Sequence, residues 1–299
     1  LLSSISPSFG KYRIYSGRIQ GAPFSSVLPV SNMADSIVLW KQYLTSYTGM
    51  VYGFENVAGK SGMGLGLTNQ LIWTDAMRKS DAAGRLRILK RSNAGYWINP
   101  NGKPRYDSNG NPEISPDRIR VFKDALPRAF LVPSMRVPGK GKMLYTYYHK
   151  EFDPTRAVLL NEPVDFQESS QFKGKVGEVA YSPNHVTVKT RQEGNGFLVL
   201  LDSYFPGWTV TVDGEERPIL QANHFYRAVQ LGPGEHTLEF DYFPEGFKEG
   251  LMVSFIFLLI LIALPLCKPI KRLYFQPSRS SDSGPDFEKP LESDTAPDK

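Results

Sequence analysis

Cysteine and histidine are scarce in this chain of 299 residues. The one cysteine, Cys267, ends an apolar run near the C-terminus, so the region before that run has no disulfide. The four histidines are His149, His185, His224 and His236, and none of them lies in an HxH or HExxH pattern or has a cysteine partner. Transition-metal ligands usually recur at such short spacings. The sequence therefore predicts no metal site.

Motifs for nucleotides and nucleic acids are also lacking. The run SGMGLG at 61–66 follows no Rossmann-type strand, and PGKGK at 138–142 has the wrong spacing for a Walker loop. No basic helix, zinc spacing or RNP-type aromatic motif is present. We therefore expect no nucleic-acid partner and no cofactor in this chain. Its net charge of +5 suits either an anionic bilayer or an ordinary solvated surface.

The strongest positive signal is an apolar run of about 17 residues at 251–267, which as a helix nearly crosses the hydrocarbon core of a bilayer. A buried core helix, the alternative, is rarely so free of polar positions. Lys268, Lys271 and Arg272 follow the run at once, and such cations mark the cytoplasmic side. We therefore expect one transmembrane helix at 250–267 and a cell-membrane location. The bulk of the chain is expected outside the cytoplasm and the C-terminal tail inside it.

The two ends of this run and of the chain add further expectations. Phe243 and Phe247 precede the run, and Tyr274 and Phe275 follow it, so all four are candidate aromatic anchors at the membrane interfaces. The chain begins with Leu-Leu-Ser-Ser and has no basic n-region or cleavage site. An exterior domain needs an upstream signal for translocation, so we expect the C-terminal part of a longer membrane protein or a mature form.

Changes in composition divide the chain into four expected parts. Turn-rich residues at 99–117 end an α+β exterior region at 1–117, and a β-rich exterior domain follows at 118–249. The transmembrane helix comes next, and residues 268–299, rich in Ser, Asp, Pro and Glu, form a largely disordered tail. Within the first region we expect strands at 11–15, 86–89 and 96–98, and helices at 35–47 and 67–77.

Alternating apolar and polar residues dominate the second region. The run FLVLL at 197–201 predicts a central strand that is buried on both faces. Residues 186–188, 208–212 and 238–242 alternate as half-buried strands do, and Asp213-Gly214 suits a tight hairpin turn. The expected fold is mainly β with an α+β N-terminal part: an antiparallel β-sandwich or jelly roll that precedes the transmembrane helix.

Four residues are candidates for binding a substrate sugar. Tyr204 and Phe205 precede a Pro-Gly turn, which favours exposed rings that stack on a sugar's apolar face. Trp208 is a third candidate, although its strand parity with Val210 favours a core position. Arg227 is the fourth candidate.

Arg227 shares strand parity with Val229 and Leu231, which predicts an inward-facing guanidinium group. A buried charge needs a partner, so a structural ion pair with Asp202 or Asp213 is favoured over ligand binding. Catalysis by paired carboxylates needs two groups held across the scissile bond. Spacing establishes no such pair here, and we predict no catalytic residue.

The densest basic cluster consists of Arg85, Arg87, Lys90 and Arg91. Such a cluster is able to bind lipid headgroups or a polyprenyl phosphate. A solvated strand edge is the favoured alternative, because charged side chains commonly protect such edges.

Three segments carry a family resemblance: residues 124–132 (DALPRAFLV), residues 198–213 with YFPGW and VDG, and residues 232–250 with PGEH and YFPEGF. In this order they resemble the C-terminal exterior region and last span of the YfhO-type bacterial membrane proteins, which are similar to the GT-C class of polytopic glycosyltransferases. Residues 52–59 (YGFENVAG) also fit, less specifically. The resemblance covers most of residues 50–267.

The resemblance implies transfer of a sugar from a polyprenyl-phosphate carrier to a cell-envelope polymer. In such enzymes the catalytic carboxylate lies in an exterior loop near the start of the protein, so it implies that this chain is a non-catalytic accessory domain. The implied partners are the lipid bilayer, upstream spans of the same protein, and a lipid-linked sugar or envelope glycan. The alternative function is a single-span, membrane-anchored protein that binds glycan or has a structural role without enzymatic activity.

Overall fold

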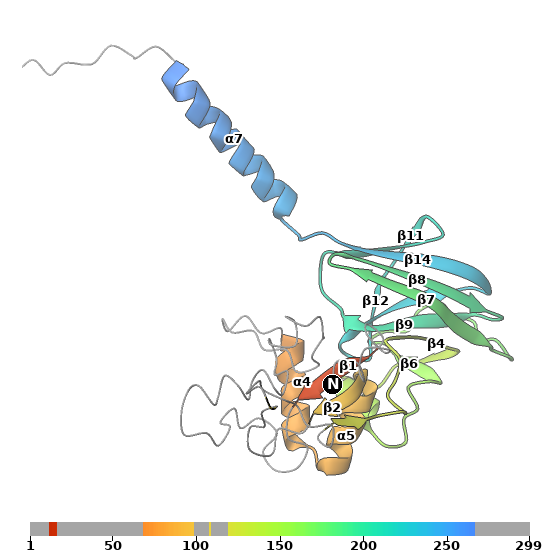
Figure 1. Ribbon diagram of the computed structural model, residues 1–299. Coiled ribbons are helices and arrows are strands. Elements are labelled where there is room, and N and C mark those ends of the chain that lie inside the picture. Colours follow the sequence, from red (N-terminus) through yellow and green to blue (C-terminus); the bar gives the residue numbers. More distant parts are fainter. Residues whose placement is uncertain (1–11, 17–67, 99–107, 109–118, 267–299) are drawn as a thin grey trace, which may run out of the picture. The chain divides into compact units, whose positions relative to one another are not determined.

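Strands make up most of the chain that the structure describes. The computed structural model describes residues 12–16, 68–98, 108 and 119–266 (Figure 1). The expected helix at 35–47, the tail at 268–299 and, apart from Ser108, the expected loop at 99–117 lie outside the described residues. The chain forms two compact units, Leu1–Glu245 and Gly246–Lys299. The expected mainly β class is confirmed for the first unit.

One layer of this unit is a five-stranded antiparallel sheet. Its strands lie in the order β11 (Glu215–Arg217), β10 (Trp208–Val212), β14 (Gly234–Tyr242), β8 (His185–Gln192) and β7 (Gly174–Ser182). The expected hairpin turn joins β10 to β11. Its two central residues, Asp213 and Gly214, have φ angles of 54° and 86°. Both positions of a type I′ turn require such positive values.

A four-stranded antiparallel sheet forms the next layer, in the order β12 (Leu220–Ala222), β13 (Tyr226–Leu231), β9 (Gly196–Ser203) and β4 (Ala129–Val132). Every residue of β9 except Ser203 is buried. Leu198 and Leu200 face the five-stranded sheet, whereas Phe197, Val199 and Leu201 face the opposite way. The expected central strand, buried on both faces, is therefore confirmed.

The core between the two sheets follows from strand alternation. Figure 1 shows β14, β8 and β7 stacked over β9 and β4. One apolar cluster fills the space between the sheets with side chains from six strands. Its buried members are Ala129, Val186, Val188, Leu198, Leu200, Val210, Val212, Val229, Leu231, Leu238 and Phe240. The expected antiparallel sandwich is confirmed in this arrangement.

A mixed α and β layer covers the other face of the four-stranded sheet. It contains the helices α4 (Thr68–Lys79), α5 (Ala82–Arg91) and α6 (Met143–Tyr148). The strands β1 (Arg13–Ser16), β2 (Ala94–Ile98) and β3 (Ile119–Val121) form a small sheet beside β5 (Ser134–Arg136) and β6 (Ala157–Leu159). A second apolar cluster joins the three helices and β2, β5 and β6 to β9 and β13. The described residues before and after the expected boundary at 117 therefore share one core.

The predicted strand at 86–89 is wrong, because these residues lie inside helix α5. A run of only four mostly apolar residues does not distinguish a strand from a helix by periodicity. The deciding signal is Asp81, whose side chain accepts a hydrogen bond from the Gly84 amide at 2.7 Å and caps the first turn. In the helix, Ile88 and Leu89 face the core together. The helix predicted at 67–77 and the strands predicted near 11–15 and 96–98 are observed as α4, β1 and β2.

The second unit contains one long apolar helix, α7 (Phe247–Leu266). Its 20 residues rise about 30 Å, which matches the hydrocarbon thickness of a bilayer. By length and composition α7 is able to cross a membrane, and the side chains at 251–264 are all exposed. The helix begins three residues before the expected span at 250–267.

Candidate functional site

A single buried carboxylate collects three arginines at one end of the sandwich. Asp202, near the end of β9, is only 6% exposed. Its Oδ1 lies 2.5 Å from Arg13 Nη2 and 2.9 Å from Arg128 Nε, and its Oδ2 lies 3.3 Å from Arg227 Nη2. These arginines come from β1, from the segment before β4, and from β13. We call these four residues the Asp202 centre.

Aromatic rings cover two of the arginines of the Asp202 centre. The guanidinium group of Arg227 lies 3.9 Å from the ring centroid of Trp208 and 5.3 Å from that of Phe240. The guanidinium group of Arg128 lies 3.8 Å from the ring centroid of Tyr181. Cations attract the negative faces of aromatic rings, most strongly where water is excluded. The rings therefore cover the positive charges of Arg128 and Arg227, which both contact the Asp202 carboxylate.

The charges of the Asp202 centre control its protonation. Burial alone would raise the pKa of Asp202, but the charges of Arg13, Arg128 and Arg227 outweigh burial and hold that pKa below its ordinary value. Burial lowers the pKa of Arg227 to about 10, so this side chain still carries its proton at neutral pH. Arg227 Nε and Nη1 are buried and have no hydrogen-bond partner among the described residues. Stacking on Trp208 partly compensates for this loss.

The structure brings three of the sequence candidates together and separates the others from them. Asp202, Trp208 and Arg227 meet in the sandwich, so Asp202 is the partner of Arg227 and Asp213 is not. Trp208 is half-buried, because it begins β10 at the end of the sandwich and covers Arg227 there. Tyr204 is half-buried as well, whereas Phe205 is 41% exposed. No ring contact between Phe205 and the Asp202 centre is observed among the described residues.

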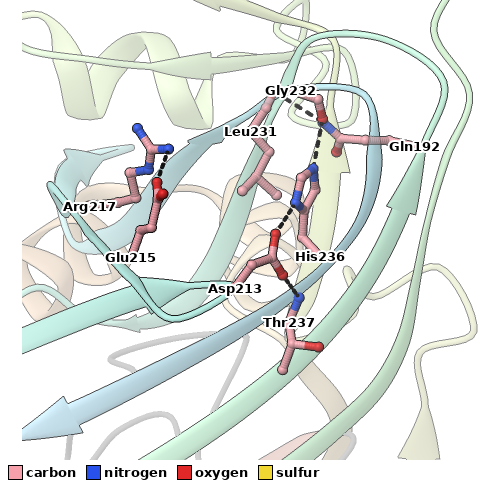
Figure 2. A network of polar contacts seen from close by, with 8 residues as sticks. All are labelled: Gln192, Asp213, Glu215, Arg217, Leu231, Gly232, His236 and Thr237. Carbon is pink, nitrogen blue, oxygen red and sulfur yellow. Dashed lines mark hydrogen bonds and ion pairs between the residues drawn. The ribbon is translucent and has the colours of Figure 1, made fainter.

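Asp213 belongs to a separate network at the opposite end of β10. Figure 2 shows His236 between Asp213 and the carbonyl of Gly232. Asp213 Oδ2 lies 2.7 Å from His236 Nδ1, and Asp213 Oδ1 accepts a hydrogen bond from the Thr237 amide at 2.8 Å. The hydrogen bond from His236 is the main cause that lowers the pKa of Asp213. Gln192 donates to the same Gly232 carbonyl at 2.6 Å and so joins the network to β8.

This network borders a cavity of about 680 Å³ between the β10–β11 hairpin and β13. A histidine beside an aspartate suggests a catalytic dyad, but His236 Nε2 faces the Gly232 carbonyl at 3.1 Å. In a catalytic triad that atom is needed to take a proton from a nucleophile. Both neighbours of the ring, the Asp213 carboxylate and the Gly232 carbonyl, belong to the turn region itself. The arrangement therefore fixes the turn before β14.

A larger groove, of about 750 Å³, lies among the three helices and has a mixed lining. Ile72, Ala76, Ile88 and Leu144 supply apolar surface. Aromatic and charged side chains supply most of the rest, together with Ser80 and Gly84, and we call this site the helical groove. Its other lining residues are Asp75, Lys79, Ser80, Asp81, Gly84, Arg87, Tyr145, Tyr148, His149 and Lys150. Tyr145 is 70% exposed and stacks at a tilt against His149, with their centroids 5.3 Å apart.

In the predicted basic cluster, three residues form contacts within the fold and the fourth lines the helical groove. Arg85 Nε donates to the Met77 carbonyl at 2.8 Å. The Arg91 guanidinium donates to the carbonyls of residues at the end of α6 and beyond it, including His149 at 3.1 Å. Lys90 pairs with Asp124 at 2.7 Å. The expected solvated strand edge is wrong because these residues lie on a helix, and of the four only Arg87 lines the helical groove.

Sequence reasoning missed Arg13, Arg128 and Tyr145. A signal for Arg128 was present in the sequence, because this residue belongs to the DALPRAFLV segment that carries the family resemblance. Tyr145 lies in the aromatic run YTYYH at 145–149, which is a signal for a surface of aromatic rings. Arg13 offered no local signal, since its partner Asp202 lies 189 residues away.

Metal binding has no support in the described part of the chain. No group of three or more His, Cys, Asp or Glu side chains there is arranged to hold a metal ion. The carboxylates discussed above contact arginines, a histidine and backbone amides.

Comparison with known proteins identifies a family for one part of the chain. Residues 164–254 match the family model described as bacterial membrane protein YfhO. The matched range runs from the segment before β7, through the five-stranded sheet, into the first part of α7. The expected YfhO-type resemblance is thereby confirmed, and it supports a membrane-associated role. No curated protein and no solved structure matches the chain.

Proposed function

We propose that this chain, YfhO-like over residues 164–254, supplies the exterior accessory domain of a membrane-embedded glycosyltransferase. The enzyme takes its sugar from a polyprenyl-phosphate carrier and modifies a polymer of the cell envelope. The residues before α7 lie outside the cytoplasm and hold the acceptor glycan near the membrane. The catalytic carboxylate belongs to another part of the enzyme.

The helical groove is the observation that carries the glycan-holding role. Its volume of about 750 Å³ lies within the range of small-molecule sites. The exposed ring of Tyr145 offers a flat surface for the C–H face of a sugar. Lys150, an exposed cation at the same groove, and the second carboxylate oxygen of Asp81 offer a charged donor and a charged acceptor for sugar hydroxyl groups, whereas Arg87 already donates to the Tyr148 carbonyl at 3.2 Å. A glycan-binding site needs both an aromatic surface and charged or polar groups that form hydrogen bonds.

The states of the carboxylates support a non-catalytic role. Asp202 is enclosed by three guanidinium groups, so it is neither accessible nor free to accept a proton at neutral pH. Asp213 already accepts hydrogen bonds from His236 and from the Thr237 amide. Glycosyl transfer and hydrolysis require carboxylates that face the scissile bond.

Binding measurements on the full chain in detergent test the glycan-holding role. The probe is soluble envelope polysaccharide purified from the same cells, and the variant is Tyr145→Ala. Loss of the ring should weaken binding roughly tenfold, which corresponds to about 1.4 kcal/mol. The matched control, Tyr145→Phe, keeps the ring and should bind as the unchanged protein does. Equal binding by all three proteins would exclude the helical groove as the glycan site.

The enzyme assignment has its own test, which is independent of the groove. An antibody to residues 120–248 should detect, in native membranes, a protein several-fold heavier than the 33.6 kDa of this chain. The same antibody should label intact protoplasts, because the epitope is proposed to face outward. A band near 33.6 kDa would instead favour the single-span protein that binds glycan or has a structural role without enzymatic activity.

A further inference from the structure

Two uncharged segments meet at the end of the sandwich where β14 finishes. Residues 203–208 (SYFPGW) join β9 to β10, and residues 242–244 (YFP) begin at the last residue of β14, which pairs with Trp208. They expose two phenylalanines, Phe205 at 41% and Phe243 at 46%. The ring centroids of Phe205 and Tyr242 lie 6.4 Å apart. We call the two segments together the aromatic edge.

Backbone contacts hold the aromatic edge in one shape. The Phe243 amide donates to the Gly207 carbonyl at 2.9 Å, and the Tyr204 amide donates to the Phe225 carbonyl at 2.7 Å. Gly207 has a φ of 95°, and a Cβ there would lie only 2.5 Å from the Phe243 carbonyl oxygen. Only glycine fits that position. The two exposed phenylalanines are therefore presented by one rigid support.

The covalent chain places this edge close to the membrane span. Tyr242 ends β14 and Phe247 begins α7, so the Cα atoms of these two residues are at most roughly 18 Å apart in any conformation. That limit is about the thickness of one polar headgroup layer and one sheet combined. An aromatic surface tethered so closely to a span meets the headgroup region, where aromatic rings are enriched.

We propose that the aromatic edge docks on the outer surface of the bilayer, with Phe205 as a second membrane anchor far in sequence from α7. Phe243 is near the membrane because the chain continues into the span. Phe205 reaches the membrane only because the fold holds its loop beside Phe243. Two separate attachments fix the tilt of the sandwich on the bilayer. This inference rests on α7 as a membrane span and not on glycosyl transfer.

Spin-label accessibility in the full chain tests this docking. In a Cys267→Ser background, a nitroxide is attached to Phe205→Cys, to Phe243→Cys as a positive control, or to Glu235→Cys as a negative control. Glu235 is exposed and lies about 24 Å from Tyr242 along β14. The proteins are placed in vesicles of equal parts phosphatidylethanolamine and phosphatidylglycerol. Collisions with oxygen report lipid, and collisions with a water-soluble nickel chelate report water.

We expect the ratio of oxygen to nickel collisions to be several-fold higher at 205 and 243 than at 235. A ratio at 205 as low as that at 235 would overturn the proposal. High ratios at all three positions would also overturn it, because the sheet would then lie flat on the bilayer. Pro206→Cys repeats the test with Phe205 in place, and near-UV circular dichroism verifies the fold of each labelled protein.

Discussion

The Asp202 centre and the helical groove are built from the same kinds of side chain but are organised in opposite ways. In the Asp202 centre, arginines and aromatic rings surround one buried carboxylate at one end of the sandwich. In the helical groove, Arg87, Asp81 and Tyr145 line an open cavity of about 750 Å³. The difference shows that charge and aromatic content do not identify a binding site. A binding site also needs open space and an accessible surface such as the Tyr145 ring, which is 70% exposed, even where Asp81 and Arg87 beside it also form hydrogen bonds within the fold.

The largest effect is expected from removing the carboxylate of the Asp202 centre. Asp202→Ala leaves three guanidinium groups without their shared partner, and breaking a buried ion pair in this way costs about 3–5 kcal/mol. Urea unfolding of the full chain in detergent measures the change. The control is Glu239→Ala on the exposed face of β14, which should change stability by less than about 0.5 kcal/mol. Equal stability of the two variants would break the comparison, since the Asp202 centre would then be no more structural than the surface.

Acid should weaken the same centre without mutation. The pKa of Asp202 is lower in the folded chain, so its charged form contributes stability that is fully present above the unfolded pKa of about 3.9. That contribution is lost as pH falls through the lower folded pKa. We therefore expect the urea midpoint of the unchanged protein to fall more steeply below about pH 3.9 than that of Asp202→Asn. Parallel pH profiles of the two proteins would contradict the assignment.

A smaller loss of stability is expected at the aromatic cover. Trp208→Ala removes the ring over Arg227 and part of the sandwich core. Because Trp208 is only half-buried, we expect about 2–3 kcal/mol rather than the larger cost of a fully buried ring. Trp208→Phe keeps an aromatic face and should retain most of the stability. Thermal unfolding in detergent distinguishes the two, and equal losses would show that stacking on Arg227 contributes little.

The smallest effect on stability is expected in the helical groove. Tyr145 is 70% exposed, so Tyr145→Ala should change the free energy of unfolding by less than about 0.5 kcal/mol. The same variant is the one expected to lose glycan binding. Unfolding curves and binding curves measured on one preparation therefore test whether the helical groove, unlike the Asp202 centre, serves binding and not stability. A large loss of stability would place the ring in the core.

Local patterns in the sequence predicted much of the fold and misjudged one helix. Alternation at 208–212 and the Asp213-Gly214 turn were sufficient for the β10–β11 hairpin, because turn geometry sets hairpin register. The short apolar run at 86–89 was assigned to a strand, because the cap at Asp81 was not weighed. Strand parity also predicted that Arg227 faces inward. Strand parity did not decide between Asp202 and Asp213 as the partner of Arg227, because it gives the direction of a side chain and not its distance from another residue.

The amino-acid sequence by itself determined several strands, the tight turn and the apolar helix, because each depends on residues close together in the chain. It also determined the family resemblance, which rests on the order of three segments. Only the tertiary structure decided that Asp202 binds Arg13, Arg128 and Arg227, that Asp213 binds His236, and that Tyr145 lines a groove. These contacts depend on how the sheets pair and stack. A one-residue change of strand register would send each of these strand side chains to the opposite face.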